Sequence, residues 1–302
     1  MRLQFVKYRR IFYTLSLILT VLSLVVILIF GLKWGIDFTG GSLMEFGYKQ
    51  QAPSQEVISE KLRGVGLGDF SLQKAGENKF ILKTKSIDEK THQDILLALK
   101  ALGDFDEGAG SFESIGPAVG AEMRNKIQIV VILSILVILV YIAISFRRVS
   151  RPVKSYIYGL TSIIALVHDV LIPLGIFVIL GKIYGVEVTI PIITALLTVF
   201  GYSINDSVVV FDRLRENLLR SKAVNFETAV DDSLNQTLGR SVNTSVTVLI
   251  TLFAIFFFGG ETLRFFSLAL ILGIGFGTYS SIFIATLLLF SFYRFQEKRK
   301  GR

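Results

Sequence analysis

Four ionisable side chains of this 302-residue chain fall inside or at the ends of long apolar runs, where a charge is costly. His168 and Asp169 interrupt the run ALVHDVLIPLG, and Asp206 follows Asn205 in FGYSINDSVVV. Arg240 directly precedes a further apolar run, SVNTSVTVLITLFAIFFF. A charge at the centre of a membrane helix costs about 2.5–3.5 kcal/mol, so such residues usually face a bundle interior and have a partner.

These side chains have the chemistry of a proton relay. Histidine changes charge near neutral pH, and burial disfavours the ionised form of an aspartate. Asp206 lies near the end of the fourth predicted span and Arg240 lies at the start of the fifth, and the two spans run antiparallel. Both residues are therefore expected toward the same membrane surface, which predicts a pair across a shared hydrated path. Polar residues at helical spacing from these two, or beside them, are predicted to support the relay: Tyr202, Ser203, Asn205, Thr244 and Thr247.

Each residue taken alone has a simpler explanation. Asp206 is also explained as an ion-pair anchor near the membrane surface, paired with Arg213 or Arg240. Arg240 is also explained as the positive flank of a membrane helix, and His168 as a core histidine bonded to a carbonyl. The His-Asp pair together with an opposed arginine favours a functional site.

Composition indicates a polytopic membrane protein. The chain is 52% hydrophobic, with a mean hydropathy of +0.60, and several uncharged runs reach the roughly 20 residues that a bilayer core needs. No cysteine is present, which excludes disulfides and thiolate chemistry. We predict an uncleaved first span and five further spans: 11–31, 127–146, 155–181, 188–211, 241–258 and 264–290.

Basic residues set the predicted orientation. They gather in the N-terminal tail (1–10), in the C-terminal tail (291–302) and in the loops that follow the second and fourth spans. Because positive residues favour the cytoplasmic side, we predict that both termini are cytoplasmic and that residues 32–126 are extracytoplasmic. The basic balance, +8 overall, is therefore explained by membrane topology rather than by nucleic-acid binding.

The segment 32–126 is predicted to be a small α+β domain. A strand over GGSLMEFGYK is followed by an amphipathic helix, two strands separated by GEN, a second helix after Ser86–Asp88 and a last strand over FDEGAGSFESI. The order β-α-β-β-α-β predicts a ferredoxin-like fold. We find no spacing typical of a phosphate loop, a metal site or a nucleophilic triad, and we expect no cofactor and no enzymatic activity.

Three segments carry a family resemblance. WGIDFTGGSLMEF, LVHDVLIPLG and GYSINDSVVVFDRLREN, together with QTLGRSVNTSVTVLITL, resemble the SecF family of bacterial protein export, over essentially the whole chain. The resemblance implies a bacterial inner-membrane subunit, similar to half of an RND-type transporter. It implies pairing with SecD, association with the SecYEG channel and often YajC, and contact with a translocating preprotein.

The resemblance also implies residue roles. In the family, the Asp of SINDS and the Arg of LGRS are linked to ion passage, and they match Asp206 and Arg240. The proton motive force, or sodium in some relatives, then assists export. The segment with Asp37, Thr39, Gly40 and Gly41 is expected to be a hinge or packing point, or simply the start of a strand. Helix movement is expected to reach the outer domain through the first span and residues 32–42.

Two other functions fit the same features. The first is an RND-like exporter of small molecules or lipids, and the second is a structural scaffold for a translocon. An exporter needs a large substrate pocket, which a domain of fewer than 100 residues disfavours. A scaffold predicts that Asp206→Asn leaves export intact.

Overall fold

The computed structural model describes residues 3–146, 153–220 and 225–300. Several basic residues that support the predicted orientation lie outside these ranges: Arg2, Arg147, Arg148, Arg151, Lys222 and Arg302. The chain divides into two compact units, a helical unit (residues 1–33 and 130–302) and an α/β unit (residues 34–129).

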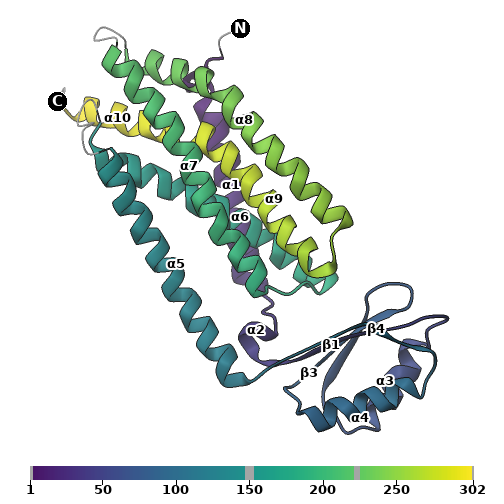
Figure 1. Ribbon diagram of the computed structural model, residues 1–302. Helices are drawn as coiled ribbons and strands as arrows, with labels where there is room; N and C mark the ends of the chain where they lie inside the picture. The colour runs from purple at the N-terminus through teal and green to yellow at the C-terminus, as the bar shows by residue number, and fades with distance from the viewer. Residues whose placement is uncertain (1–2, 147–152, 221–224, 301–302) are drawn as a thin grey trace. The chain divides into compact units, whose positions relative to one another are not determined.

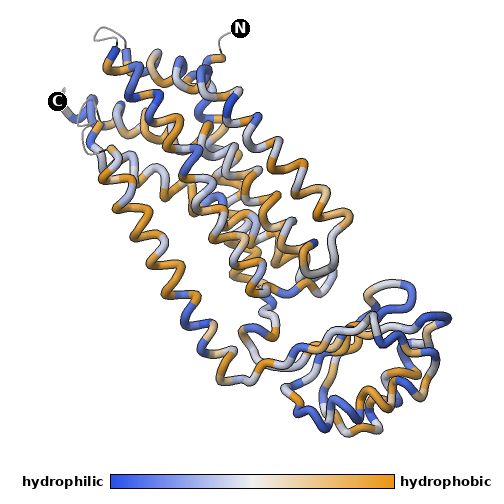
Figure 2. Tube along the Cα trace, in the orientation of Figure 1, coloured by the Kyte–Doolittle hydropathy of each residue, from blue (hydrophilic) through white to orange (hydrophobic). Residues whose placement is uncertain are grey.

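Among the described residues, six helical stretches are long and apolar enough to cross a membrane, which confirms the predicted fold class (Figures 1 and 2). The bounds of the first five are α1 Phe5–Phe30, α5 Pro117–Ser145, α6 Ser155–Tyr184, α7 Ile190–Arg220 and α8 Phe226–Phe258. The sixth stretch consists of α9 (Glu261–Ser280), a π-helical turn η1 (Ser281–Ala285) and α10 (Thr286–Lys300).

Two helices continue well past the apolar spans predicted from the sequence. α7 extends to Arg220 and α8 begins at Phe226, so both carry polar turns beyond their apolar runs. These turns contain many good helix formers, and their charged side chains can point into water while the backbone bonds continue.

The core of the helical unit is aromatic where α6 and α7 meet the end of α5. The rings of Phe146 and Tyr158 stack with centroids 5.2 Å apart, and Phe211 packs edge-on against Tyr158 at 5.2 Å. All three side chains are buried. Such aromatic contacts fix the position of α6 along the axis of α7. They therefore also fix which residues of α7 lie opposite His168 and Asp169.

α9 lies against both α7 and α8 and approaches α7 very closely. A Cβ added at Gly273 would lie 2.2 Å from Cγ2 of Val199, and one at Gly277 would lie 3.3 Å from Cβ of Ser203. Glycine at both positions therefore allows the two helices to pack closely.

The α/β unit has the predicted β-α-β-β-α-β order. Its elements are β1 Gly41–Tyr48, α3 Gln55–Arg63, β2 Phe70–Lys74, β3 Lys79–Thr84, α4 Glu89–Lys100 and β4 Phe105–Ile115, and a short helix α2 (Ile36–Thr39) precedes them. The sheet order is β2-β3-β1-β4, and every neighbouring pair is antiparallel. This is the ferredoxin-like arrangement, with α3 and α4 packed on one face of the sheet (Figure 1).

Local sequence signals explain the two helices of this unit. Ser54 and Asp88 are N-caps whose side chains accept from the backbone N–H of Val57 and Thr91. The apolar residues that recur at helical spacing are buried and share one core with residues of β1 and β3. The helices contribute Ile58, Leu62, Ile95 and Leu99, and the strands contribute Phe46, Phe80 and Leu82.

Candidate functional site: two carboxylates held by serines

Asp169 of α6 is the most enclosed ionisable side chain of the predicted relay, with 0% exposure. Its Oδ1 lies 2.9 Å from Nδ1 of His168, and its Oδ2 accepts hydrogen bonds from Ser203 (2.5 Å) and Ser280 (2.6 Å). The two hydroxyls come from α7 and α9, so three helices converge on one carboxyl group. A buried carboxyl group with three hydrogen-bonding contacts is stabilised in place rather than free to turn.

His168 is only 4% exposed, and its second ring nitrogen, Nε2, has no hydrogen-bond partner among the described residues. The ring lies between aromatic neighbours, with centroids 6.1 Å from those of Phe276 and Tyr279. Sequence analysis predicted a relay role for His168 and left open a core histidine bonded to a carbonyl. The observed partner is the Asp169 carboxyl group rather than a carbonyl.

Asp206 of α7 is only half-buried and is also bound by two serines from other helices. Oδ1 accepts from Ser241 of α8 at 2.6 Å, and Oδ2 accepts a short hydrogen bond from Ser281 of η1. Both serines are buried. The carboxylate therefore joins α7 to α8 and to the π-helical turn.

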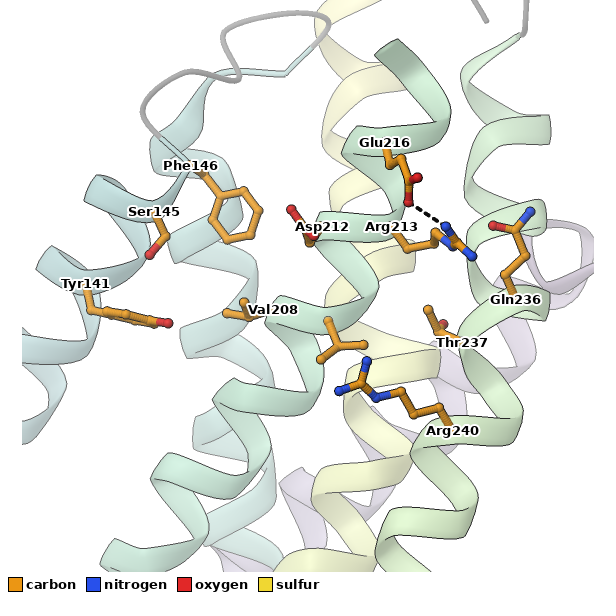
Figure 3. A pocket seen from close by; sticks show the side chains of 11 residues that line it. Tyr141, Ser145, Phe146, Val208, Asp212, Arg213, Glu216, Gln236, Thr237 and Arg240 are labelled. Carbon is orange, nitrogen blue, oxygen red and sulfur yellow. Dashed lines mark hydrogen bonds and ion pairs between the residues drawn. The ribbon is translucent and has the colours of Figure 1, made fainter. Parts of the chain in front are cut away.

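Arg240 lies one residue before Ser241, but its guanidinium forms no ion pair within the described ranges. It points from α8 toward α7 into a cleft of about 480 Å³ (Figure 3). The cleft is also lined by Asp212, Arg213 and Glu216, and Arg213 pairs with Glu216 at 2.5 Å. The ion pair between Asp206 and Arg240 that the sequence suggests is thus not formed in this conformation, and it stays a prediction.

The cleft lies between the end of α5, α7 and α8. Its walls combine aromatic and polar side chains, with Tyr141 and Phe146 on one side and Gln236 and Thr237 on the other (Figure 3).

A chain of hydroxyls connects α7, α8 and α9 next to Asp206. The Tyr202 hydroxyl lies 3.0 Å from Oγ of Ser245, which in turn contacts the Thr278 hydroxyl. Ser245 can also donate to the carbonyl oxygen of Ser241, at 2.9 Å. Tyr202 and Ser203, both singled out in the sequence, therefore serve different partners, because Ser203 turns toward Asp169.

The other predicted supporting residues lie on exposed faces of the chain. Asn205, Thr244 and Thr247 are exposed, and the two threonine hydroxyls donate only to carbonyls of α8. The buried polar face of α8 is instead the serine and threonine series at four-residue spacing: Ser233, Thr237, Ser241 and Ser245. Sequence analysis missed Ser241, Ser280 and Ser281, although the four-residue spacing of the series on α8 was available as a signal.

The glycine pair at the start of β1 is tightly packed within the α/β unit. Gly40 has φ +72° and Gly41 has φ +139°, values that L side chains rarely adopt. A Cβ at Gly40 would lie 2.7 Å from Cα of Pro117, and one at Gly41 would lie 2.9 Å from the carbonyl oxygen of Thr84. Glycine is thus required twice, and β1 begins at the second of these residues.

The short helix before this pair contains the other two predicted motif residues. Asp37 lies in its first turn, and the Thr39 hydroxyl donates to the carbonyl of Gly35 at 3.0 Å. Trp34 packs edge-on against Phe38, with centroids 5.0 Å apart. The segment is well packed at this point, and a hinge movement there stays a prediction.

Comparisons with known proteins identify the family. A family model described as protein export membrane protein SecD/SecF, C-terminal, matches residues 96–294, and a SecD/SecF GG motif model matches residues 25–52. The chain belongs to the SecD/SecF family of protein-export membrane proteins. The GG motif match covers Gly40 and Gly41, and the larger match covers Asp169, Asp206 and Arg240.

Individual SecD/SecF relatives are similar over most of this chain. The protein translocase subunit SecF of Thermobaculum terrenum is 44% identical over 299 residues, which cover 95% of this chain and 92% of that protein. The corresponding subunit of Haemophilus influenzae is 38% identical over 284 residues, covering 93% of this chain and 83% of that protein.

Solved SecDF structures share the fold. The translocon-associated SecDF of Thermus thermophilus superposes with a TM-score of 0.82 at 32% identity. The match covers 97% of this chain but only 39% of the SecDF chain. A second SecDF structure, in a form called super-membrane-facing, gives a TM-score of 0.70. This chain therefore spans well under half of the SecDF length.

Proposed function

We propose that this chain is a SecF-type subunit that uses an ion gradient, with a SecD-type partner, to assist protein export across the bacterial inner membrane. One observation carries the proposal: the half-buried Asp206 carboxylate, held only by two serine hydroxyls, lies on the helix next to an unpaired Arg240. Within apolar helices, such groups are retained because they act on ions or partners rather than for stability.

The coupling follows from the charge states of these two groups. A proton that crosses about 100 mV releases about 2.3 kcal/mol, enough to shift a two-state helix arrangement. Ionised Asp206 attracts the Arg240 guanidinium, and protonated Asp206 does not.

The exposed polar side chains next to this site support a partner there. Asn205, Thr244 and Thr247 lie on faces of α7 and α8 that this chain leaves uncovered, although both helices are apolar enough to span a membrane. Polar groups are costly against lipid, so a SecD-type helix is the natural cover. We propose that the ion path lies at this interface, close to Asp206.

α1 is suited to carry movement from the helical unit to the α/β unit. At its start, the backbone N–H of Val6 donates to Asp231 of α8 at 3.0 Å, and Asn235 bonds both the N–H and the C=O of Leu3. At its end, the carbonyl of Lys33 accepts from Val188 at 2.7 Å. The residues at both ends of α1 are therefore hydrogen-bonded to other parts of the helical unit, one to α8 and one to the loop between α6 and α7, and the chain continues from α1 into the α/β unit.

The remaining parts of the assembly belong to the same proposal. The subunit works beside the SecYEG channel and YajC, with the α/β unit on the periplasmic side near the emerging preprotein and both termini in the cytoplasm. The basic tails face the anionic lipid of the cytoplasmic leaflet. The chemistry is translocation, without a catalytic group or cofactor.

The test is gradient-stimulated export in vesicles that contain the reconstituted complex. Asp206→Asn and Arg240→Met each abolish the stimulation while the complex still assembles, because each removes one of the two charges that must meet. Asp212→Asn, a carboxylate of the same cleft with 70% exposure, is the matched control and leaves stimulation unchanged. Normal stimulation in an assembled Asp206→Asn complex would refute the proposal.

A further inference from the structure

Two consecutive serines join the two carboxylates. Ser280, the last residue of α9, donates to Oδ2 of Asp169, and Ser281, the first residue of η1, donates to Oδ2 of Asp206. Both serines are fully buried. The two acids lie on different helices, α6 and α7, and a single peptide unit of the sixth span links them.

The backbone at this point is irregular. η1 is a π-helical turn of five residues inside an otherwise α-helical span, and it begins at Ser281. The hydroxyl of Thr286 donates to the carbonyl oxygen of Ser281 at 3.1 Å, across the same five-residue spacing as the π turn. Single π turns inside α-helices are less stable than the helix around them and occur frequently at functional sites.

Each of the two serines has a second acceptor within reach. The Ser281 hydroxyl lies 3.0 Å from the carbonyl oxygen of Thr278, and the Ser280 hydroxyl lies 3.1 Å from that of Gly277. A hydroxyl has one proton to donate, so it can serve either the carboxylate or the carbonyl. An ionised carboxylate takes that proton, whereas a protonated carboxyl group can donate its own and leave the hydroxyl proton to the helix carbonyl.

We propose that Ser280 and Ser281 form a positioning pair in which each hydroxyl changes its donor partner with the charge of its carboxyl group, so that Asp169 and Asp206 influence each other through the π turn. The inference rests on the proposed function, because it requires that Asp206 gains and loses a proton. No ion, water or partner group is needed for the coupling, because both acids hold the same backbone turn. Coupling of this kind is reciprocal.

Other ionisable side chains lie near the two acids. They come from four helices of the bundle: His168 from α6, Tyr202 from α7, Arg240 from α8 and Tyr279 from α9. None of these four lies within hydrogen-bond distance of the Ser280 or Ser281 hydroxyl. Substitution of either serine therefore changes the link between the acids without removing a charge.

The experiment uses the full chain with its partner subunit in lipid nanodiscs. Infrared difference spectra follow the carboxyl C=O stretch as the pH is varied, and Asp206→Asn and Asp169→Asn assign the two bands. We expect Ser281→Ala to move the midpoint of the Asp206 band by about one pH unit to higher pH, since the ionised form loses a donor. The same variant also moves the Asp169 band, which Ser281 does not touch, and Ser280→Ala gives the reciprocal pattern.

Three further variants keep the test falsifiable. Ser281→Thr retains the hydroxyl and keeps both midpoints, whereas Ser281→Cys fits the same space with a weak donor and repeats the shift if Ser281→Ala does not fold. Ser267→Ala is the matched control, because Ser267 is a buried serine of α9 whose described hydrogen bonds go only to carbonyls of its own helix. It leaves both bands unchanged.

The outcome that overturns the inference is a Ser281→Ala variant in which the Asp206 band shifts and the Asp169 band stays. Absence of any shift overturns it as well. These results are distinguishable from failure of the proposed function, because the infrared bands do not depend on export. Reciprocal shifts together with normal export by Asp206→Asn would reject the function and retain the coupled pair.

Discussion

Asp169 and Asp206 lie on neighbouring helices, and each accepts hydrogen bonds from two serines of other helices, but their surroundings differ in one respect. Asp169 is fully enclosed and also contacts His168, whereas Asp206 is half-buried and lies on the helix beside a cleft that contains an unpaired arginine. A titrating group that works on an ion gradient needs access to water. The comparison teaches that the more accessible acid is the better candidate for proton exchange, and the enclosed acid for structural response.

The largest effect that tests this comparison is the loss of stability that we expect from Asp169→Asn. The substitution places an amide N–H₂ among hydroxyls that donate to the carboxylate, and so leaves donors unpaired in an enclosed site. We expect it to lower the free energy of unfolding by about 1–3 kcal/mol. Thermal unfolding of the detergent-solubilised chain measures it. Asp206→Asn is the control, and we expect it to lower the free energy of unfolding by less. Equal losses of unfolding free energy would remove the distinction between the two sites.

A smaller effect concerns the hydroxyl chain beside Asp206. Tyr202→Phe removes the contact with Ser245 while the ring stays in place. Hydrogen bonds between membrane helices contribute about 0.6 kcal/mol on average, and we expect a loss of this size in thermal unfolding. Thr247→Val on the exposed face is the control without loss in the isolated chain. A Tyr202→Phe loss as large as that of Asp169→Asn would place the main structural site beside Asp206 instead.

The smallest expected effect is a change in the stability of the α/β unit with pH, over the neutral pH range in which export is measured. Burial raises the pKa of the Tyr48 phenol to about 12, and its hydroxyl donates to the carbonyl of Leu99. A folded-state pKa above the unfolded value of about 10 gives stability that is fully present below pH 10 and is lost as the pH rises through about 12.

Hydrogen exchange of residues 34–129 in the full chain checks this expectation. Protection attributable to Tyr48 stays constant between pH 5 and 9 and falls only in alkaline solution, and Tyr48→Phe removes that alkaline fall. A Tyr48-dependent change near neutral pH would mean that pH profiles of export do not report the two aspartates alone.

The fold was largely predictable because its signals are local. Apolar length determined six spans, and period-two and helical spacing in the segment 32–126 gave the β-α-β-β-α-β order that the structure confirms. The family resemblance is confirmed by the comparisons with SecD/SecF proteins. Neither result required knowledge of how the helices turn about their own axes.

The site was only partly predictable for that same reason. The sequence singles out Asp169, Asp206 and Ser203. It does not single out the other serines that bind the two acids, because serine is common in membrane helices and lipid is as apolar as a helix interface. These other serines are Ser241, Ser280 and Ser281. Hydropathy therefore cannot tell which face of α8 turns inward. The predicted face with Thr244 and Thr247 is exposed, and the face with Ser241 and Ser245 is buried.

The central claim is that Asp206 exchanges a proton under working conditions, and one measurement tests it most directly. In proteoliposomes that contain the complex, the Asp206 carboxyl band is followed by infrared difference spectroscopy between pH 5 and 9, with Asp206→Asn as the blank. The account predicts that the protonated band appears and disappears within this range, and that Arg240→Met shifts its midpoint. A carboxylate that stays ionised throughout, with or without Arg240, would contradict the account.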